Sequence, residues 1–164
     1  MQYNLDKMTA ADWDAVREIY LEGIATRNAA IETEAPAWNE WNANHRPDYR
    51  LVAHSGGKVL GWVVLSPVSQ TPAYSRVAKE SICVAASARG TGVGKALLSA
   101  LIEESEEAGI WSLEALIFPE NTASIPLHKG VGFREIGVQE RKGSLDGVWR
   151  DVVLMERRSK VVGI

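Results

Sequence analysis

The segment Arg89–Lys95, with the sequence RGTGVGK, has the residue types and spacing best suited to chemistry in this chain. Three glycines alternate with other residues between an apolar run and a helix-like pattern. Glycine lets the backbone approach a ligand closely and adopt positive φ, and the N–H groups that open a helix favour an anion. Arg89 adds a charge-assisted hydrogen bond. The segment indicates a phosphate site, and a tight surface turn is the simpler alternative.

Two well-known nucleotide motifs do not fit this segment. The dinucleotide fingerprint is G-x-G-x-x-G, whereas Gly90, Gly92 and Gly94 give G-x-G-x-G. The P-loop is G-x-x-x-x-G-K-[ST], but Arg89 occupies its first glycine position and Ala96 follows the lysine. These mismatches weigh against a nucleotide-binding protein.

Strands and helices with recognisable periodicity must position the glycine loop. The pattern predicts a first helix capped by Thr9, a short helix over Trp38–Asn42 and a hairpin that turns at 55–57. A strand precedes the loop, a helix follows it, and Gly109 is placed to end that helix. The predicted strands are Leu51–Ala53, Val59–Leu65, Val77–Val84, Leu113–Phe118, Arg134–Val138 and Val148–Met155, and the later helices are Val93–Ala108 and Thr122–Lys129.

Bulk composition sets limits on function. A length of 164 residues predicts a single domain over 1–164, and a net charge of −3 argues against nucleic-acid binding. The lone Cys83 fits a reducing cytoplasm, and no stretch predicts a signal peptide or a membrane span. We expect a cytoplasmic protein without nucleic-acid or membrane partners.

The segment SICVAASARGTGVGKALL resembles the strand and acetyl-CoA loop of the GNAT acetyltransferases. IFPENTASIPLHKGVGF resembles their next strand and helix. More narrowly, AIETEAPAW, GWVVLSPVS and GVWRDVVLMERRS resemble the phosphinothricin N-acetyltransferase branch, and the likeness runs from about Leu5 to Ser159. The resemblance implies an α/β (α+β) fold. Its single mixed, mostly antiparallel sheet has about six to seven strands flanked by helices, and a splayed parallel strand pair binds acetyl-CoA.

The resemblance also implies which residues hold acetyl-CoA, the expected cosubstrate. The pantetheine arm would pair with the backbone of one strand, its diphosphate would lie on the glycine loop, and an asparagine would bond the arm. No metal is expected. The corresponding positions are Ile82, Cys83 and Val84, then Arg89, Gly90, Thr91, Gly92, Val93, Gly94 and Lys95, and finally Asn121 and Ser124.

The implied chemistry is direct attack of a primary amine on the thioester, which needs a base and a proton source for the leaving thiolate. The family's catalytic Glu falls at Lys79. Glu80 is adjacent but would face the other side of the strand unless a bulge shifts the register. Otherwise a bound water or another carboxylate, such as Glu32 or Glu34, must act. His128 is the candidate acid. Its alternative is a helix-face histidine bonded to the backbone.

The acceptor site departs from the family pattern as well, because Thr71 stands where an Arg usually meets the substrate carboxylate. Candidate substrate-binding residues are Glu34, Trp38, Arg76 and Trp149. We expect an N-acetyltransferase acting on the primary amine of a small molecule, such as an amino acid or a phosphinothricin- or methionine sulfoximine-like analogue, and working as a homodimer. A protein N-terminal acetyltransferase and a non-catalytic acyl-CoA sensor are the alternatives.

Overall fold

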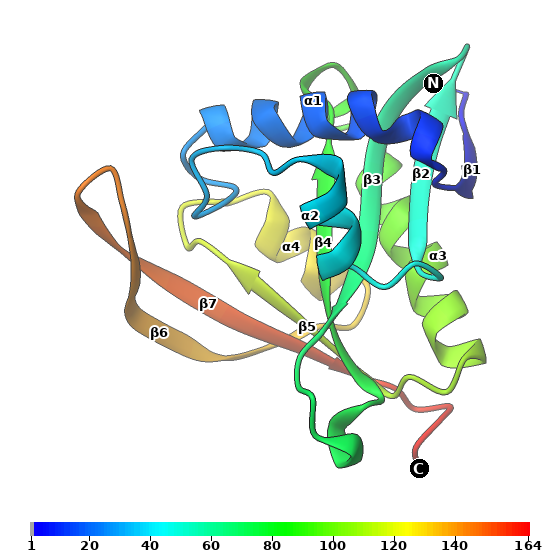
Figure 1. Cartoon of the computed structure of the whole chain (residues 1–164). Coiled ribbons are helices and arrows are strands. Elements are labelled where there is room, and N and C mark those ends of the chain that lie inside the picture. Colours follow the sequence, from blue (N-terminus) through cyan, green and yellow to red (C-terminus); the bar gives the residue numbers. More distant parts are fainter. Residues whose placement is uncertain (1) are drawn as a thin grey trace.

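A computed structural model of the protein describes residues 2–164 and contains one seven-stranded sheet in the order β1-β2-β3-β4-β5-β7-β6. All neighbouring strands are antiparallel except β4 and β5, which are parallel (Figure 1). The strands are β1 Asn4–Lys7, β2 Arg50–Ser55, β3 Lys58–Pro67, β4 Val77–Val84, β5 Ser112–Ile117, β6 Arg134–Leu145 and β7 Val148–Arg158. This arrangement confirms the predicted fold class.

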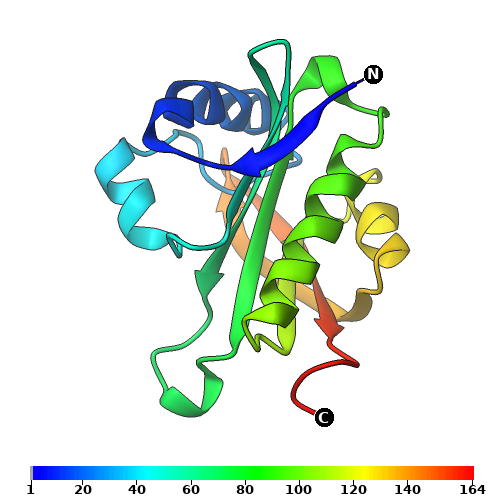
Figure 2. The ribbon, with the colours of Figure 1, turned by 90° about the vertical axis from the view of Figure 1, so that its right-hand side faces the viewer.

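Helices cover both faces of the sheet, with α1 and α2 on one side and α3 and α4 on the other (Figure 2). The α-helices are α1 Trp13–Ala25, α2 Trp38–Asn44, α3 Val93–Glu107 and α4 Ser124–Gly130; 3-10 turns cover Ala10–Asp12, Pro72–Tyr74 and Ala86–Ala88. Among residues 2–164, none of the helices combines the length and apolar character that a membrane crossing requires.

The helices bury the faces that their periodicity predicts. On α1 the buried residues include Val16, Ile19 and Ile24, and on α3 they include Leu97, Leu98 and Leu101. Thr9 caps the 3-10 turn that leads into α1, where its N–H donates to Asp12 Oδ2 at 2.8 Å, whereas the cap residue of α1 itself is Asp12. Packing of apolar side chains on both sides of β2, β3 and β4 forms the main core.

The parallel pair β4–β5 opens into a V. Its register holds only for Val77–Ser112, Ala78–Leu113 and Lys79–Glu114, after which the two strands diverge (Figure 1). Beyond that point β5 pairs on its other side with β7, while β4 stays paired with β3. The main-chain groups of β4 past Lys79 therefore face a gap in the sheet.

The strand bounds differ from the sequence prediction mainly at the two edges of the sheet. Strand β1 was not predicted, because its four residues, NLDK, carry no clear alternation. The strand predicted over Arg134–Val138 extends to Leu145, since most residues of β6 are exposed and polar and give little periodic signal. Pairing with β7, rather than local hydrophobicity, holds this edge strand in place.

Candidate active site

A cavity of about 1010 Å³ passes through the V between β4 and β5. Its walls come from both faces of the sheet, from the loop between α1 and α2, and from α4. They bring together seven of the sequence-predicted site residues: Glu34, Glu80, Ile82, Cys83, Asn121, Ser124 and His128. The cavity is therefore the candidate active site.

The two faces of β4 carry different chemistry. Cys83 lies on the α1 face, since its sulfur is 4.0 Å from a Cβ built on Gly23, and alternation puts Lys79 and Ser81 on the same face. Val84 lies on the α3 face, 3.4 Å from a Cβ built on Gly94. The acid Glu80 shares the face of Val84.

The register of β4 decides what Glu80 can reach. The pairing of β3 with β4 runs without a shift from Gly61–Val84 to Pro67–Ala78. The bulge that would turn Glu80 toward the α1 face is absent from this described pairing. Glu80 therefore does not take the place of the family's Glu, whose position is occupied by Lys79.

Main-chain groups of β4 point into the open V at alternate residues. The Ala85 N–H donates to the Leu60 carbonyl at 2.8 Å, so the alternation of antiparallel hydrogen bonds directs the main chain of Cys83 toward β3. The same alternation directs the N–H and C=O groups of Ile82 and Val84 into the gap. An extended chain with amide groups can add to β4 there as a further strand.

The glycine loop forms the expected cradle at the start of α3. Gly90 and Gly92 have φ of 74° and 89°, a region that side-chain-bearing residues rarely adopt. At the start of α3, the Ala96 N–H donates to the Gly92 carbonyl at 3.0 Å. The N–H groups of Val93–Lys95, which precede this bond, have no hydrogen-bond partner within the helix.

The surroundings of the cradle suit a diphosphate. The side chain of Arg89 is exposed beside the loop, and the N-terminal end of α3 carries partial positive charge. A Cβ on Gly94 would stand 3.3 Å from Leu127 and 3.4 Å from Val84, so glycine lets α3, α4 and β4 pack closely here. The hydroxyl of Thr91 is used locally, because it donates to the Ala88 carbonyl.

Glu80 and His128 form a buried pair on the α4 side of the V. His128 Nε2 hydrogen-bonds Glu80 Oε1, and its Nδ1 donates to the Ser124 carbonyl at 2.7 Å. Burial opposes the charged imidazole, but the hydrogen bond and charge of Glu80, with the Ser124 carbonyl, leave the pKa of His128 raised. The second oxygen, Glu80 Oε2, is buried and has no hydrogen-bond partner among residues 2–164. The pair can hold a proton next to the cavity.

Cys83 is a poor nucleophile in this setting. Burial first, and then the negative charge of Glu80, raise the pKa of Cys83 to about 12. The thiol thus stays protonated near neutral pH, whereas the thiolate is the reactive form. Cys83 contributes its place in the strand rather than its sulfur.

Asn121 and Ser124 border the V where α4 begins. The Ser124 N–H donates to Asn121 Oδ1 at 3.3 Å, so the side-chain oxygen of Asn121 is occupied by the turn before α4. Its amide nitrogen remains available to an acceptor group in the cavity. Ser124 Oγ lies 3.3 Å from His128 Nδ1, which links this border to the buried pair.

Three predicted substrate-binding residues are not brought to the cavity. Trp38 packs on Trp13 and Trp41 in the aromatic cluster over α1. Arg76 is at the other end of β4, where its guanidinium donates to the Ala108 carbonyl at 2.6 Å. Trp149 is 64% exposed near the tip of the β6–β7 hairpin. None of them is among the described residues that line the cavity.

Other aromatic residues form the acceptor-side wall instead. Tyr20 stands edge-on to Trp62 with centroids 6.0 Å apart, and Trp62 stands edge-on to Trp41 at the same separation. In the sequence, Trp41 and Trp62 could be acceptor-pocket or core residues, whereas the helical spacing of Tyr20 indicated only a core position; all three line the cavity. Trp62 Nε1 is buried without a hydrogen-bond partner among residues 2–164.

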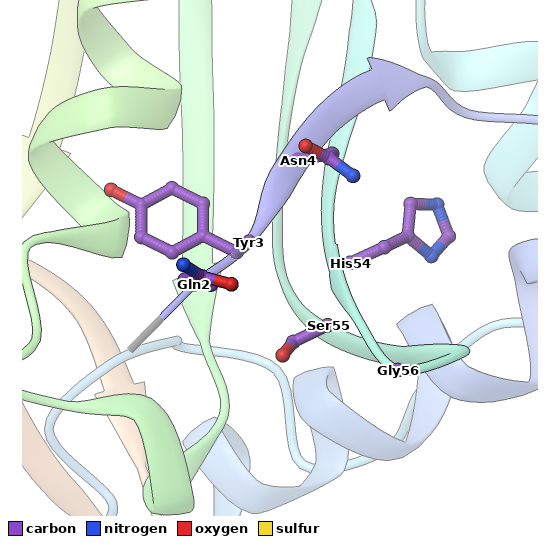
Figure 3. Close-up of a pocket in the computed structure, with 6 residues that line it drawn as sticks. All are labelled: Gln2, Tyr3, Asn4, His54, Ser55 and Gly56. Carbon is purple, nitrogen blue, oxygen red and sulfur yellow. The ribbon is translucent and has the colours of Figure 1, made fainter.

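A second hollow, of about 520 Å³, lies at the β1–β2 edge of the sheet (Figure 3). Its lining consists of Gln2, Tyr3, Asn4, His54, Ser55 and Gly56. The only ion pair here among the described residues is a loose one, between His54 Nε2 and Asp12 at 3.8 Å. The predicted site residues all lie elsewhere, so this hollow is not the candidate active site.

Comparisons with known proteins agree with this geometry. The family model described as "Acetyltransferase (GNAT) family" matches residues 10–133. The phosphinothricin N-acetyltransferase of Alcaligenes faecalis is 35% identical over 153 residues, covering 89% of this chain and 77% of that protein. The L-methionine sulfoximine/L-methionine sulfone acetyltransferase of Pseudomonas aeruginosa is 29% identical over 153 residues, covering 89% and 88%.

One of the similar solved structures contains bound acetyl-CoA. The GNAT superfamily phosphinothricin acetyltransferase from Sinorhizobium meliloti, in complex with acetyl-CoA, superimposes with a TM-score of 0.87 at 30% identity. The alignment covers 99% of this chain and 91% of that one. Since both the family model and the fold extend over most of its length, the chain belongs to the acetyltransferase (GNAT) family and is an acetyl-CoA-dependent N-acetyltransferase.

Proposed function

We propose that this enzyme acetylates the primary amine of a small molecule, an amino acid or a close analogue of one. The observation that carries the proposal is the cavity through the V, which joins the open main chain of β4 to an aromatic-walled space on the α1 face. The names of the two relatives, for phosphinothricin and for methionine sulfoximine, support an acceptor of this class.

The residues that would hold acetyl-CoA are those that the resemblance implied. Gly90–Lys95 would offer amides to the diphosphate, with Arg89 as the charged partner. The main chain of Ile82 and Val84 would pair with the pantetheine arm, and Asn121 would donate its side-chain amide. When bound, acetyl-CoA supplies the thioester that the amine attacks.

The Glu80–His128 pair is proposed as the proton source for the leaving thiolate. His128 is held with both ring nitrogens engaged, and Glu80 Oε2 is the polar atom of the pair left without a partner in the described chain. Because the pair is enclosed, a proton lost to the thiolate can be replaced from the acceptor nitrogen rather than from solvent.

The test is turnover. The protein is mixed with acetyl-CoA and a panel of free amino acids, their analogues and short peptides with free N-termini, and released thiol is followed. The expected result is saturable turnover on at least one free amino acid or analogue and none on the peptides. Saturable coenzyme A binding without turnover on any amine would favour the sensor instead, and turnover confined to peptides would favour the protein N-terminal acetyltransferase.

We further infer a cytoplasmic homodimer. Acetyl-CoA is a cytoplasmic metabolite and the single cysteine suits a reducing compartment. Exposed apolar side chains on the β6–β7 hairpin, including Val138, Val148 and Trp149, offer a surface for a second copy. In sedimentation experiments we expect the wild type to form a dimer and Trp149→Ser to form a dimer that dissociates more readily. A wild type that is monomeric at micromolar concentration would contradict this inference.

A further inference from the structure

The α1 face of β4 lacks an acid. Lys79, Ser81 and Cys83 occupy it, and the only carboxylate of the strand, Glu80, faces α4 and is engaged by His128. An ammonium group that enters from the α1 face therefore meets no carboxylate on β4. The amine must lose a proton before it can attack, so a base has to come from another element.

Three carboxylates line the cavity apart from Glu80, namely Glu32, Glu34 and Glu40. They all come from the loop between α1 and α2 or from α2 itself. Glu32 shares this cavity with Tyr20 of α1 and Cys83 of β4. After the larger effect of burial, its negative charge raises the pKa of Tyr20, and it raises the pKa of Cys83 after burial and the charge of Glu80.

Packing locates Glu32 more closely. Tyr20 stands edge-on to Trp62, and Trp62 is the register partner of Cys83 across the β3–β4 pair. Glu32 lines the same cavity as Tyr20, Trp62 and Cys83, next to the part of β4 that has already separated from β5. This part of the V is accessible from the α1 face of the sheet.

The loop that carries Glu32 is held by contacts with the β6–β7 hairpin, which is remote in sequence. Arg150 of β7 donates to the Arg27 carbonyl at 2.6 Å and to Asn28 Oδ1 at 2.9 Å. The side chain of Ile31 lies 3.2 Å from a Cβ built on Gly143 of β6. The β6–β7 hairpin thus holds the segment immediately before Glu32.

The Glu32 carboxylate has no ion-pair partner among the described residues. None of the ion pairs among residues 2–164 involves it. The lysines that line the same cavity are Lys79 of β4 and Lys142 of β6. An exposed anion at the cavity wall, next to a phenol that can donate to it, is suited to receive a cation from solution.

We propose that Glu32, positioned by the phenol of Tyr20, is the carboxylate that receives the acceptor's ammonium group and takes its proton. This role rests on the proposed N-acetyltransferase function and supplies the base that β4 lacks. Glu32 is a catalytic residue in this proposal, and Tyr20 is a positioning residue.

The proton balance of the step closes. The carboxylate of Glu32 takes one proton from the ammonium, which leaves a neutral amine. The amine nitrogen bonds to the thioester carbon, the carbon–sulfur bond breaks, and the sulfur leaves as the thiolate of coenzyme A. The thiolate takes a proton from the Glu80–His128 pair. The nitrogen gives up a second proton as the amide forms, and this proton reprotonates the pair. Glu32 then returns its proton to water.

The test compares Glu32→Gln with two matched variants. Glu40→Gln removes the same charge from the same cavity wall, and Glu18→Gln removes it from an exposed position on α1 outside the cavity. For Glu32→Gln we expect kcat/KM to fall about 100-fold or more near neutral pH, with an unchanged dissociation constant for acetyl-CoA. Glu18→Gln should leave both unchanged.

The pH profile separates a base from a structural residue. In Glu32→Gln the remaining rate should climb about tenfold per pH unit, because only acceptor already deprotonated in solution can react, whereas the wild-type profile should be flatter. Tyr20→Phe should lose about tenfold in kcat/KM, since one hydrogen bond to a charged group is removed.

Two outcomes would overturn the role of Glu32 while leaving the enzyme assignment intact. One is a Glu32→Gln variant that turns over at the wild-type rate, and the other is an equal loss in Glu32→Gln and Glu40→Gln with parallel pH profiles. A wild-type protein that binds acetyl-CoA but acetylates no amine would instead overturn the proposed function itself.

Discussion

Glu80 and His128 lie 48 residues apart in the chain, yet their side chains form one hydrogen-bonded pair with only 2% and 1% of their surfaces exposed. Strand β4 supplies the first and helix α4 the second, and the ring of His128 also meets Phe133 edge-on at 5.0 Å. Removing one member of such a pair leaves the other buried without its partner, which costs more than the pair itself contributes.

A double-mutant cycle on this pair should therefore be strongly non-additive. Glu80→Ala and His128→Ala are each expected to lower the free energy of unfolding by about 3–5 kcal/mol. The double variant should lose clearly less than the sum, because neither group is then left alone. Urea denaturation of the four proteins measures the coupling, and additive losses within about 0.5 kcal/mol would show that the side chains do not interact.

The stability of the protein should fall as pH rises past neutrality. The pKa of His128 is raised in the folded state, so its stabilising effect is complete below the unfolded value of 6.5 and is lost as pH rises through the folded value. The slope cannot exceed about 1.4 kcal/mol per pH unit for one group. Urea titrations at half-unit steps above pH 6 should show this fall in the wild type and its absence in His128→Gln; identical slopes would exclude His128 as the source.

Arg89→Ala should weaken acetyl-CoA through its diphosphate. The loss of a hydrogen bond to a charged group corresponds to about a tenfold or larger rise in the dissociation constant. Acetyl-pantetheine, which has no diphosphate, should bind wild type and variant equally. Calorimetry with both ligands measures the difference, and Arg17→Ala, an exposed arginine on α1, is the matched control. Equal weakening of the two ligands would place Arg89 outside the diphosphate site.

Cys83 should resist alkylation in the folded protein. With a pKa of about 12 almost none of the thiol is ionised at pH 8, and only the thiolate reacts with iodoacetamide. We expect labelling at least about 100-fold slower than that of a small thiol, and rapid labelling once urea unfolds the chain. Mass spectrometry over time gives both rates. Labelling of the native protein as fast as glutathione would mean that the thiol is neither buried nor suppressed.

Local sequence determined the elements that are proposed to hold acetyl-CoA. The bounds predicted for Val77–Val84 agree with β4, and the helix predicted from Val93 ends one residue earlier than expected. Gly90 and Gly92 adopt the positive φ that their spacing indicated. These features depend on backbone preferences and side-chain periodicity over a few residues, which a single sequence displays directly.

Only the tertiary structure decided which side chains meet in the cavity. The regular register of β3 with β4 turned Glu80 toward His128, and helix docking placed Tyr20 and Trp62 on the cavity wall while Arg76 fell at the far end of its strand. The sequence alone predicted the glycine loop at the start of α3 because neighbours in the chain build it. The acceptor side is assembled from residues dozens of positions apart, and sheet order and helix packing, which no local pattern encodes, set their distances.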